Sequence, residues 1–491
     1  MQLQALLKDF VELKQDCTIT GLASDTRKLS PGQVFVALKG PHGHSLNYAA
    51  QAIAQGATAI LYDPQTVSAS TVVANEKYPL IAIDNLNEHL GTISARFYDE
   101  PTGKMAIIGI TGTNGKTSCS QFLGQLLEQC GIIGTLGWGN WGQLIFTGYT
   151  TPDALMTQEI LAEGVKQHWQ ALAIEVSSHG IAEHRIGGIR FKGVVLTNIS
   201  RDHLDFHGSM AAYIDTKKAL FALPDNEFAV INLDDTYSDE FIAVIPDNTV
   251  IWGFSIGSKT IAHPKIHQVY ADNINPLTEG LRFDVCLKDQ RQVIQVPLYG
   301  EFNVENILAV ITVMLALGHS LSEIAEKVRG LAPVTGRMQR FGDHTSALIF
   351  VDYAHTPDAL HKALISARQH CKNKLWVVFG CGGDRDTGKR PEMGSIAEQY
   401  ADHVIITDDN PRSESPSQIV QDILSGCQSD TIRVIHNRAE AIRQAILSAS
   451  TEDCIVIAGK GHELYQEYKS QKLPFSDAEV VIQVLASRAT Q

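Results

Sequence analysis

Short apolar runs that end in polar residues recur along most of this 491-residue chain. Seven of them are "KMAIIGI" before "TGTNGKTS", "ALAIEV" before "SSHG", "GVVLT" before "NISRDHLD", "ALIFV" before "DYAHTPD", "WVVFG" before "CGGDRD", "HVIIT" before "DDNPR" and "CIVIA" before "GKGHE". Helical patterns alternate with these runs, which predicts α/β units around largely parallel sheets. Ligands of open α/β sheets bind beyond the carboxyl ends of the strands, so the polar endings are the first candidates for functional residues.

The length of the chain predicts more than one domain. A chain of 491 residues exceeds what one hydrophobic core usually serves, so about three domains are expected. Two stretches, 97–105 and 331–343, combine Pro, Gly and polar residues between periodic segments, as linkers do. They predict an N-terminal domain over residues 1–102, a central domain over 103–334 and a C-terminal domain over 335–491.

Composition excludes several classes of function. The chain is 44% hydrophobic and 19% charged, as in soluble globular proteins, and its net charge of −14 argues against nucleic-acid or membrane binding. The eight cysteines are scattered without a CxxC pair, which favours reduced thiols in a cytoplasmic protein over a disulfide framework or a zinc site. The N-terminus lacks the apolar region of a secretory signal, and the apolar run 307–318 is too short to span a bilayer.

The stretch "GITGTNGKTS" is typical of a phosphate-binding loop. Gly112 and Gly115 let backbone N–H groups approach phosphate oxygens at a helix N-terminus, Lys116 adds positive charge, and Thr117 can bind Mg²⁺. The strict GxxxxGK[ST] pattern fails because Ile110 replaces its first glycine. The nearest candidate for the base-recognition element of GTPases, "NKLW", has no Asp at its fourth position, so ATP is favoured over GTP.

Acids and imidazoles at two other strand ends suit a metal ion. Glu175 ends one apolar run, and Asp202, His203, Asp205 and His207 follow another. Carboxylates and imidazoles suit Mg²⁺ or Mn²⁺, whereas the lack of a cysteine set disfavours structural zinc. Taken singly, each of these residues is more often a hydrogen-bonding loop residue than a ligand.

Taken together and in order, these motifs resemble the Mur ligases. They include "TGTNGKTS", "EVSSHG", "TNISRDHLDFHG", "YGEFNVENILA", "GRMQRF", "VDYAHTPDAL", "FGCGGDRDTGKRP", "DDNPR" and "AGKGHE", and "SDTRKLSPGQVFVALKG" extends the match to the N-terminal part. The resemblance implies three α/β domains: a central P-loop ATPase-like domain with a mostly parallel sheet, a Rossmann-like C-terminal domain and a smaller N-terminal domain. It also implies ATP-dependent amide formation, and it is strongest to the branch that adds a diamino acid to UDP-N-acetylmuramoyl-L-alanyl-D-glutamate.

The resemblance assigns residues to ATP and to a metal ion. It implies Lys116, His203 and Lys217 as catalytic residues, with Lys217 carbamylated by CO₂. Tyr213, four positions earlier, selects Lys217 over Lys218, although both would read as solvated helix lysines without the family. Its ATP-binding residues would be Gly112, Thr113, Asn114, Gly115, Lys116, Thr117, Ser118, Asn303, Asn306, Arg337 and Asp352. It implies two Mg²⁺ ions, one held by Thr117 and Glu175 and a second held by His203 and the carbamate of Lys217.

Other residues would bind the UDP substrate. On the uridine and diphosphate side the resemblance implies Ser24, Thr26, Pro41, His42 and Gly43, and on the peptide side Thr150, Thr151, Ser177, Glu183 and Arg185. Tyr149 stands where relatives often carry Asn, and Glu183 stands where Gln is familiar. Arg185 is the stronger candidate because a guanidinium suits a carboxylate or a phosphate.

The stretch "DDNPR" bears on which amino acid is added. Asp, Asn and Pro after a strand favour a turn, and that interpretation alone needs no ligand. In the branch that adds meso-2,6-diaminopimelate, however, an Arg at the position of Arg412 holds the distal carboxylate, and relatives that add L-lysine typically lack it. The resemblance completes the diaminopimelate pocket with Arg385, Asp409, Asn410, Pro411, Gly459 and Glu463.

Two alternatives remain at this point. Folylpolyglutamate synthetase shares the fold and the acyl-phosphate chemistry, but the first domain and "DDNPR" argue against it. A nucleotide-binding regulator without chemistry would be expected to lose metal-site positions, yet Lys116, Thr117, Glu175, His203 and Lys217 are all present. We therefore expect a monomeric cytoplasmic ligase that acts on small molecules.

Overall fold

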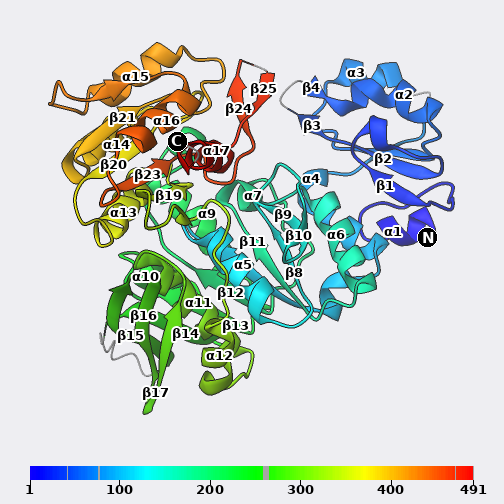
Figure 1. Ribbon diagram of the computed structural model, residues 1–491. Helices are drawn as coiled ribbons and strands as arrows, with labels where there is room; N and C mark the ends of the chain where they lie inside the picture. The colour runs from blue at the N-terminus through cyan, green and yellow to red at the C-terminus, as the bar shows by residue number, and fades with distance from the viewer. Residues whose placement is uncertain (41–42, 76–77, 258–264, 470, 490–491) are drawn as a thin grey trace. The chain divides into compact units, whose positions relative to one another are not determined.

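The computed structural model describes residues 1–40, 43–75, 78–257, 265–469 and 471–489 (Figure 1). The chain divides into two compact units. The first comprises Met1–Ile110, Leu127–Val194 and Leu223–Glu227, and the second comprises Thr111–Leu126, Val195–Ala222 and Phe228–Gln491. Two sheets carry the seven polar strand ends that the sequence singled out.

The N-terminal part forms a parallel four-stranded sheet with the order β1-β2-β5-β6. Val34 and Val36 of β2 pack in the core formed with α1 and α4, whereas Phe35 and Ala37 pack in the core on the other face. The sheet is therefore covered on both faces. The elements of the N-terminal part are α1 (Leu3–Leu7), β1 (Gly21–Ala23), η1 (Thr26–Lys28), β2 (Gln33–Ala37), β3 (Lys39–Gly40), β4 (Gly43–His44), η2 (Ser45–Tyr48), α2 (Ala49–Ala54), β5 (Ala59–Tyr62), α3 (Ala69–Asn75), β6 (Leu80–Ala82), α4 (Leu86–Phe97) and η3 (Pro101–Lys104).

The rest of the first unit is built on strands in the order β10-β9-β8-β11-β7. Strands β7, β11 and β8 are parallel, and β9 and β10 add an antiparallel edge. Helix α6 packs against α4 of the N-terminal part, which ties that part to the same unit. The elements are β7 (Ala106–Thr111), β8 (Cys130–Gly134), β9 (Gly137–Asn140), β10 (Gln143–Ile145), α6 (Ala154–Lys166), β11 (Ala171–Glu175) and α7 (Ser178–Ala182).

In the second unit β13, β14 and β15 are parallel, and β16 and β17 continue them antiparallel. The sequence did not predict this edge: connections of only two residues, 278–279 and 288–289, allow antiparallel pairing alone. The elements are α5 (Lys116–Leu126), β12 (Gly193–Leu196, which begins in the first unit), α8 (Leu204–His207), α9 (Met210–Phe221), β13 (Phe228–Asn232), α10 (Ser238–Ile242), β14 (Val250–Ile256), β15 (Ile266–Leu277), β16 (Gly280–Leu287), β17 (Gln290–Val296), α11 (Phe302–Ala316) and α12 (Leu321–Val328).

The apolar run 307–318 lies mainly in α11, which is buried against α5, β13 and β14. The expectation of a buried helix is therefore confirmed. Within the described ranges, no helix is both long enough and apolar enough to cross a membrane.

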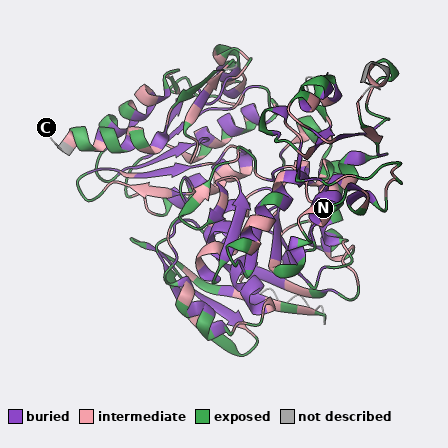
Figure 2. Ribbon diagram, turned by 90° about the vertical axis from the view of Figure 1, so that its right-hand side faces the viewer, coloured by how far each residue is buried: buried purple, intermediate pink, exposed green. Residues whose placement is uncertain are grey.

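The C-terminal sheet has the order β18-β19-β23-β20-β21-β22, parallel except for β18. One core contains Phe350 and Val456 with α13, α14 and α15, and the other contains Ile349 and Ile457 with α16 and α17. Figure 2 shows buried strands beside helices that carry the exposed residues. The elements are β18 (Gln339–Phe341), β19 (Leu348–Asp352), α13 (Pro357–Arg368), β20 (Leu375–Phe379), α14 (Lys389–Tyr400), β21 (His403–Ile406), α15 (Pro416–Leu424), β22 (Arg433–Val434), α16 (Arg438–Ser448), β23 (Cys454–Ala458), β24 (Tyr465–Tyr468), β25 (Gln471–Pro474) and α17 (Asp477–Ala489).

The fold confirms the seven predicted strands, which are β7, β11, β12, β19, β20, β21 and β23. Helices cover both faces of the C-terminal sheet, so its central strands β19, β20 and β23 are continuous runs of mostly apolar residues rather than alternating ones. The domain boundaries at 102 and 334 stay predictions.

Candidate active site

The turn between β7 and α5 has the backbone of a phosphate-binding loop. Gly112 and Gly115 have φ angles of +143° and +87°, which side chains rarely allow. A Cβ atom at Gly112 would lie 1.9 Å from Thr197 Oγ1, and one at Gly115 would lie 2.3 Å from Asn306 Oδ1, so both positions require glycine. Lys116 Nζ donates to the carbonyl oxygen of Gly112 across 2.7 Å, which holds its charge over the loop.

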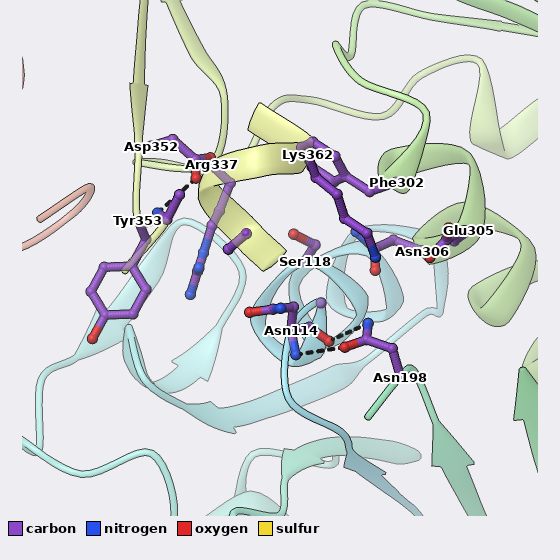
Figure 3. Close-up of a pocket in the computed structure, with 13 residues that line it drawn as sticks. Asn114, Ser118, Asn198, Phe302, Glu305, Asn306, Arg337, Asp352, Tyr353 and Lys362 are labelled. Atoms are coloured by element: carbon purple, nitrogen blue, oxygen red, sulfur yellow. Dashed lines mark hydrogen bonds between the residues drawn. The ribbon is translucent and has the colours of Figure 1, made fainter. Parts of the chain in front are cut away.

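A pocket lies beside this loop (Figure 3). Figure 3 shows Asp352 at one end, Glu305 and Asn306 at the other, and Asn114 of the loop and Ser118 of α5 between them. A pocket beside a phosphate-binding loop suits a nucleotide. Its lining residues are Asn114, Gly115, Ser118, Asn198, Phe302, Glu305, Asn306, Arg337, Asp352, Tyr353, Ala354, Ala359 and Lys362.

Arg337 and Asp352 reach this pocket from the C-terminal part of the second unit. Arg337 Nη2 donates to Thr117 Oγ1 across 3.0 Å, so its guanidinium contacts the helix that begins in the phosphate loop. The carboxylate of Asp352 accepts from the backbone N–H groups of Met338 (2.6 Å) and Ala354 (2.8 Å), and burial raises its pKa. Asp352 thus shapes the backbone at the pocket, and its predicted contact with ATP stays a prediction.

The two asparagines of "NVEN" have different positions. Asn306 lines the pocket, whereas Asn303 donates to the carbonyl oxygen of Tyr299 (2.7 Å) and accepts from Asn306 Nδ2 (3.3 Å). Asn303 therefore does not line the pocket but orients Asn306 through this hydrogen bond. Glu305, which the sequence reasoning missed, also lines the pocket; burial raises its pKa to about 7, and the Asp234 carboxylate adds to the effect.

Lys217 of α9 points into the phosphate loop. Its side chain is 1% exposed, and its Nζ donates to the carbonyl oxygen of Gly112 across 3.0 Å and lies 4.8 Å from the centre of the Tyr213 ring. Burial lowers the pKa of Lys217 well below its ordinary value, and the positive charge of Lys116 lowers it further. Lys218, the alternative, forms ion pairs on the outer side of the helix.

The loop after β12 gathers an acid between two imidazoles. Asp202 is buried, and its Oδ2 lies 3.4 Å from His203 Nε2 and 3.9 Å from His355 Nε2. Asp205 and His207 lie on the short helix α8. Among the residues that the structure describes, no three His, Cys, Asp or Glu side chains are grouped to hold a metal ion. The expected ligand set does not depend on such a group, because it includes a threonine and a modified lysine.

In the first unit, Glu175 lies at the end of β11 and is fully buried. Its carboxylate accepts from the backbone N–H (3.1 Å) and the hydroxyl (3.0 Å) of Thr135, which also bonds to Thr150 (2.9 Å between hydroxyl oxygens). Thr151 Oγ1 donates to the carbonyl oxygen of Glu175 across 2.8 Å and lies 3.0 Å from Ser177 Oγ. The structure thus brings Thr150, Thr151 and Ser177 together around this strand end.

Arg185 contacts Glu183 and Tyr149. Its Nε donates to Glu183 Oε2 across 2.8 Å, and its guanidinium carbon lies 5.5 Å from the centre of the Tyr149 ring. Its Nη1 donates to the carbonyl oxygen of Thr151 across 2.8 Å. Tyr149 and Glu183 therefore contact the arginine.

Two of the N-terminal candidates, Ser24 and Thr26, follow the end of β1 in the four-stranded sheet. Ser24 follows β1, Thr26 begins η1 and is buried, and Gly43 lies in β4 with a φ angle of +125°. Pro41 and His42 lie outside the described residues.

The loops after β21 and β23 meet at the C-terminal candidates. Asn410 Nδ2 donates to Glu463 Oε2 across 2.8 Å, and Lys460 Nζ donates to both Asn410 Oδ1 (3.0 Å) and Glu463 Oε2 (2.7 Å). A Cβ atom at Gly459 would lie 2.7 Å from Asp409 Oδ2, so the loops require glycine there. The fully buried Lys460 was not predicted, although it stands inside the motif "GKGHE".

Arg412 lies at the edge of this cluster. Its Nη1 donates to the carbonyl oxygen of Gly383 (2.7 Å) and its Nε to Glu467 Oε2 (3.2 Å). A Cβ atom at Gly383 would lie 1.9 Å from the carbonyl oxygen of Pro411, so the two loops are in close contact. Arg385 is exposed, and its Nη1 donates to the neighbouring carbonyl oxygen of Asp384.

Comparison with known proteins identifies the family. Three family models match the chain: "Mur ligase family, catalytic domain" over residues 18–98, "Mur ligase middle domain" over 110–314 and "Mur ligase, glutamate ligase domain" over 336–461. A relative from Alkalilimnicola ehrlichii, named "UDP-N-acetylmuramoyl-L-alanyl-D-glutamate--2,6-diaminopimelate ligase", is 43% identical, and the match covers 99% of each chain. The chain belongs to the Mur ligase family.

Solved structures agree with this membership. One solved structure is of a protein named "UDP-N-acetylmuramoyl-L-alanyl-D-glutamate--2, 6-diaminopimelate ligase", whose sequence is 33% identical to that of this Mur ligase. The two structures match with a TM-score of 0.70 over 100% of this chain and 99% of the other. The three-domain α/β architecture with a mostly parallel central sheet is thereby confirmed. Folylpolyglutamate synthase from Mycobacterium tuberculosis, solved with ADP and AMPPCP, is 17% identical with a TM-score of 0.62 over 76% of this chain and 92% of its own, which shows a shared fold alone.

Sequence reasoning missed several residues of this Mur ligase that line or support its sites. Phe302 and Glu305 are three positions apart on α11 and share the pocket-facing side of that helix, a spacing that could have found them. Glu467 lies on the β24–β25 hairpin, and no local pattern pointed to it. The others are Tyr353, Lys362 and Lys460.

Proposed function

We propose that this Mur ligase joins meso-2,6-diaminopimelate to UDP-N-acetylmuramoyl-L-alanyl-D-glutamate at the expense of ATP, giving the UDP-N-acetylmuramoyl-tripeptide of peptidoglycan synthesis, ADP and phosphate. The observation that carries the proposal is the cluster of Arg412, Asp409, Asn410 and Glu463 where the loops after β21 and β23 meet. The distal end of diaminopimelate carries one carboxylate and one ammonium group. A guanidinium beside carboxylates suits both groups. The name of the 43%-identical relative supports the same reaction.

The reaction has two steps. An oxygen of the substrate carboxylate attacks the γ-phosphorus of ATP, the bond to the β–γ bridging oxygen breaks, and ADP leaves. The amine then attacks the acyl-phosphate carbon, loses a proton, and displaces inorganic phosphate as the amide forms. The reacting groups are anionic, so neutralising charge and positioning are the main tasks of the protein. Lys116 over the loop and Arg337 beside Thr117 supply fixed positive charge where we propose the phosphates bind.

We propose two Mg²⁺ ions: one is held by Thr117, with Glu175 added from the resemblance alone, and the second is held by His203 and the carbamate of Lys217. Hydroxyl and carbamate oxygens are donors that Mg²⁺ prefers, and the imidazole of His203 is added from the resemblance. The metal neutralises phosphate charge when bound. Lys217 fits this set only when modified, because an ammonium repels a cation whereas a carbamate is an anion. Its buried amine, with a lowered pKa, favours the neutral form that reacts with CO₂.

The first unit is proposed to bind the UDP substrate. Ser24 and Thr26 follow the end of β1, the position where α/β folds bind ligands, and Gly43 lies in the separate β3–β4 pair. Arg185 is proposed to bind a carboxylate of the peptide arm, and Thr150, Thr151 and Ser177 to offer hydroxyl groups to the same arm.

The test measures phosphate release from ATP by the purified protein. UDP-N-acetylmuramoyl-L-alanyl-D-glutamate is supplied with meso-diaminopimelate, with L-lysine or with neither, and mass spectrometry identifies the product. Release that requires both the UDP substrate and diaminopimelate is expected. Phosphate release that is the same with and without the UDP substrate and the amino acid would reject the ligase activity. Faster release with L-lysine than with diaminopimelate would reject diaminopimelate as the amino acid that is added.

Three further points are proposals as well. The domain boundaries are placed at 102 and 334, and the protein is taken to act as a monomer in the cytoplasm. The eight cysteines, scattered along the chain without a CxxC pair, support a cytoplasmic location.

A further inference from the structure

Two backbone hydrogen bonds join the hairpin β24–β25 to the "DDNPR" loop. Arg412 N–H donates to the carbonyl oxygen of Glu467 across 3.0 Å, and Lys469 N–H donates to the carbonyl oxygen of Arg412 across 2.6 Å. Arg412 and Tyr468 form an isolated parallel bridge at this point. The hairpin therefore fixes the backbone of Arg412, which has a left-handed φ angle of +50° that non-glycine residues rarely adopt.

The side chain of Arg412 is fixed at two further points. Glu467 Oε2 accepts from its Nε at 3.2 Å, and the carbonyl oxygen of Gly383 accepts from its Nη1 at 2.7 Å. Because a guanidinium is planar, two anchors on different nitrogens determine its orientation. Among the described residues, Nη2 has no hydrogen-bond partner, so this nitrogen and the second hydrogen of Nη1 are left to bind a carboxylate in a bidentate manner.

Glu467 is also tied to the other residues of the cluster. Its N–H donates to Asn410 Oδ1 across 2.9 Å, and the same amide oxygen accepts from Lys460 Nζ. The amide nitrogen of Asn410 donates to Glu463. One hairpin residue therefore connects the guanidinium to the residues proposed to hold the distal ammonium.

We infer that Glu467 is a positioning residue for diaminopimelate: it touches no substrate but orients Arg412 toward the distal carboxylate. The inference rests on the proposed function. If the Glu467 carboxylate only blocked the Arg412 guanidinium, it would compete with the distal carboxylate of diaminopimelate. Its removal would then tighten the binding of diaminopimelate. A positioning carboxylate has the opposite effect, because without it the guanidinium must be ordered at the moment of binding.

The experiment compares steady-state kinetics of the full chain with Glu467→Ala and Glu467→Gln. Glu467→Ala is expected to raise the KM for diaminopimelate about ten-fold while kcat and the KM for ATP change less than about two-fold. Glu467→Gln keeps an oxygen that accepts from Nε, so most of the affinity is expected to return. Glu452→Ala, an exposed glutamate before β23, is the matched control and should behave as wild type.

Three results would overturn the inference: an unchanged or lower KM for diaminopimelate in Glu467→Ala, an equal rise in the KM for ATP, or no recovery in Glu467→Gln. The wild-type protein separates this inference from the proposed function. If the wild-type protein turns over diaminopimelate and Glu467→Ala leaves the KM for diaminopimelate unchanged, only the role of Glu467 is rejected and the proposed function stands. Wild-type turnover with L-lysine instead of diaminopimelate rejects both.

Discussion

The side-chain nitrogen of Lys217 donates a hydrogen bond to the backbone carbonyl oxygen of Gly112 across 3.0 Å. The contact places an amine from α9 directly on the phosphate-binding loop. Burial lowers the pKa of this amine, and Lys116 lowers it further, so the neutral form is favoured. A neutral amine adds CO₂, whereas an ammonium does not. This pair of residues therefore connects the packing of α9 to the proposed carbamate.

Replacing Lys217 with Ala is expected to lower the ligase rate by roughly 100-fold or more, because a buried group that stabilises charge at the phosphates is lost. Added formate or acetate should restore part of the rate by supplying a carboxylate in the vacated space. The measurement is phosphate release with and without the added acid.

Lys218→Ala is the control for the Lys217 prediction. Lys218 Nζ forms ion pairs with Asp215 (2.7 Å) and Glu240 (3.4 Å) rather than contacting the loop, so its loss should leave the rate near wild type. A large loss at Lys218 with little change at Lys217 would show that the carbamate assignment is one residue out of register.

Replacing Arg412 with Ala is expected to lower kcat/KM for diaminopimelate by about 100-fold, because charged hydrogen bonds to the distal carboxylate are lost. The KM for ATP should change little. Arg443→Ala, an exposed arginine paired with Glu440 on α16, is the matched control. Unaltered diaminopimelate kinetics in Arg412→Ala would remove the main support for the proposed amino acid.

Much of the fold could be predicted because buried parallel strands leave a local signal. β23, "CIVIA", is buried on both faces and is one continuous apolar run, as are β20 and the last three residues of β21. The requirement for glycine at positions 112 and 115 could be predicted for a similar reason, since the motif itself encodes the tight turn. The antiparallel strands β16 and β17 were missed, since short connections rather than apolar runs determine them.

The remaining site residues depend on contacts between distant parts of the chain. Asn303 and Asn306 look equivalent in sequence, yet the carbonyl oxygen of Tyr299 draws Asn303 behind the pocket wall. Glu467 meets Arg412 across 55 residues, a distance over which no periodicity operates. Tertiary packing of this kind decides which polar residue faces a ligand and which one supports it.

Replacing Gly91 of α4 with Ala is expected to destabilise the first unit by about 1–3 kcal/mol, because the added methyl group overpacks a backbone contact. Its Cβ atom would lie 2.1 Å from the carbonyl oxygen of Gly187, and neither backbone can move aside by changing a rotamer. The measurement is the urea midpoint. Gly103→Ala, where a Cβ atom would meet nothing within 4 Å, should not lower it. Equal midpoints for Gly91→Ala and wild type would contradict this packing.

Replacing Glu305 with Gln is expected to stabilise the ligand-free protein at pH 8 more than at pH 5. Burial raises the folded-state pKa of Glu305 from 4.5 to about 7. Between these two values the unfolded chain ionises while the folded chain keeps its proton, so stability falls as pH rises toward 7 and the loss is complete above it. Gln carries no such penalty, so the gain should reach roughly 1–3 kcal/mol at pH 8. Thermal melting from pH 5 to 8 measures the difference, with exposed Glu326→Gln of α12 as the control. A gain that did not grow with pH would mean that the Glu305 carboxyl group is ionised at little cost beside the nucleotide pocket.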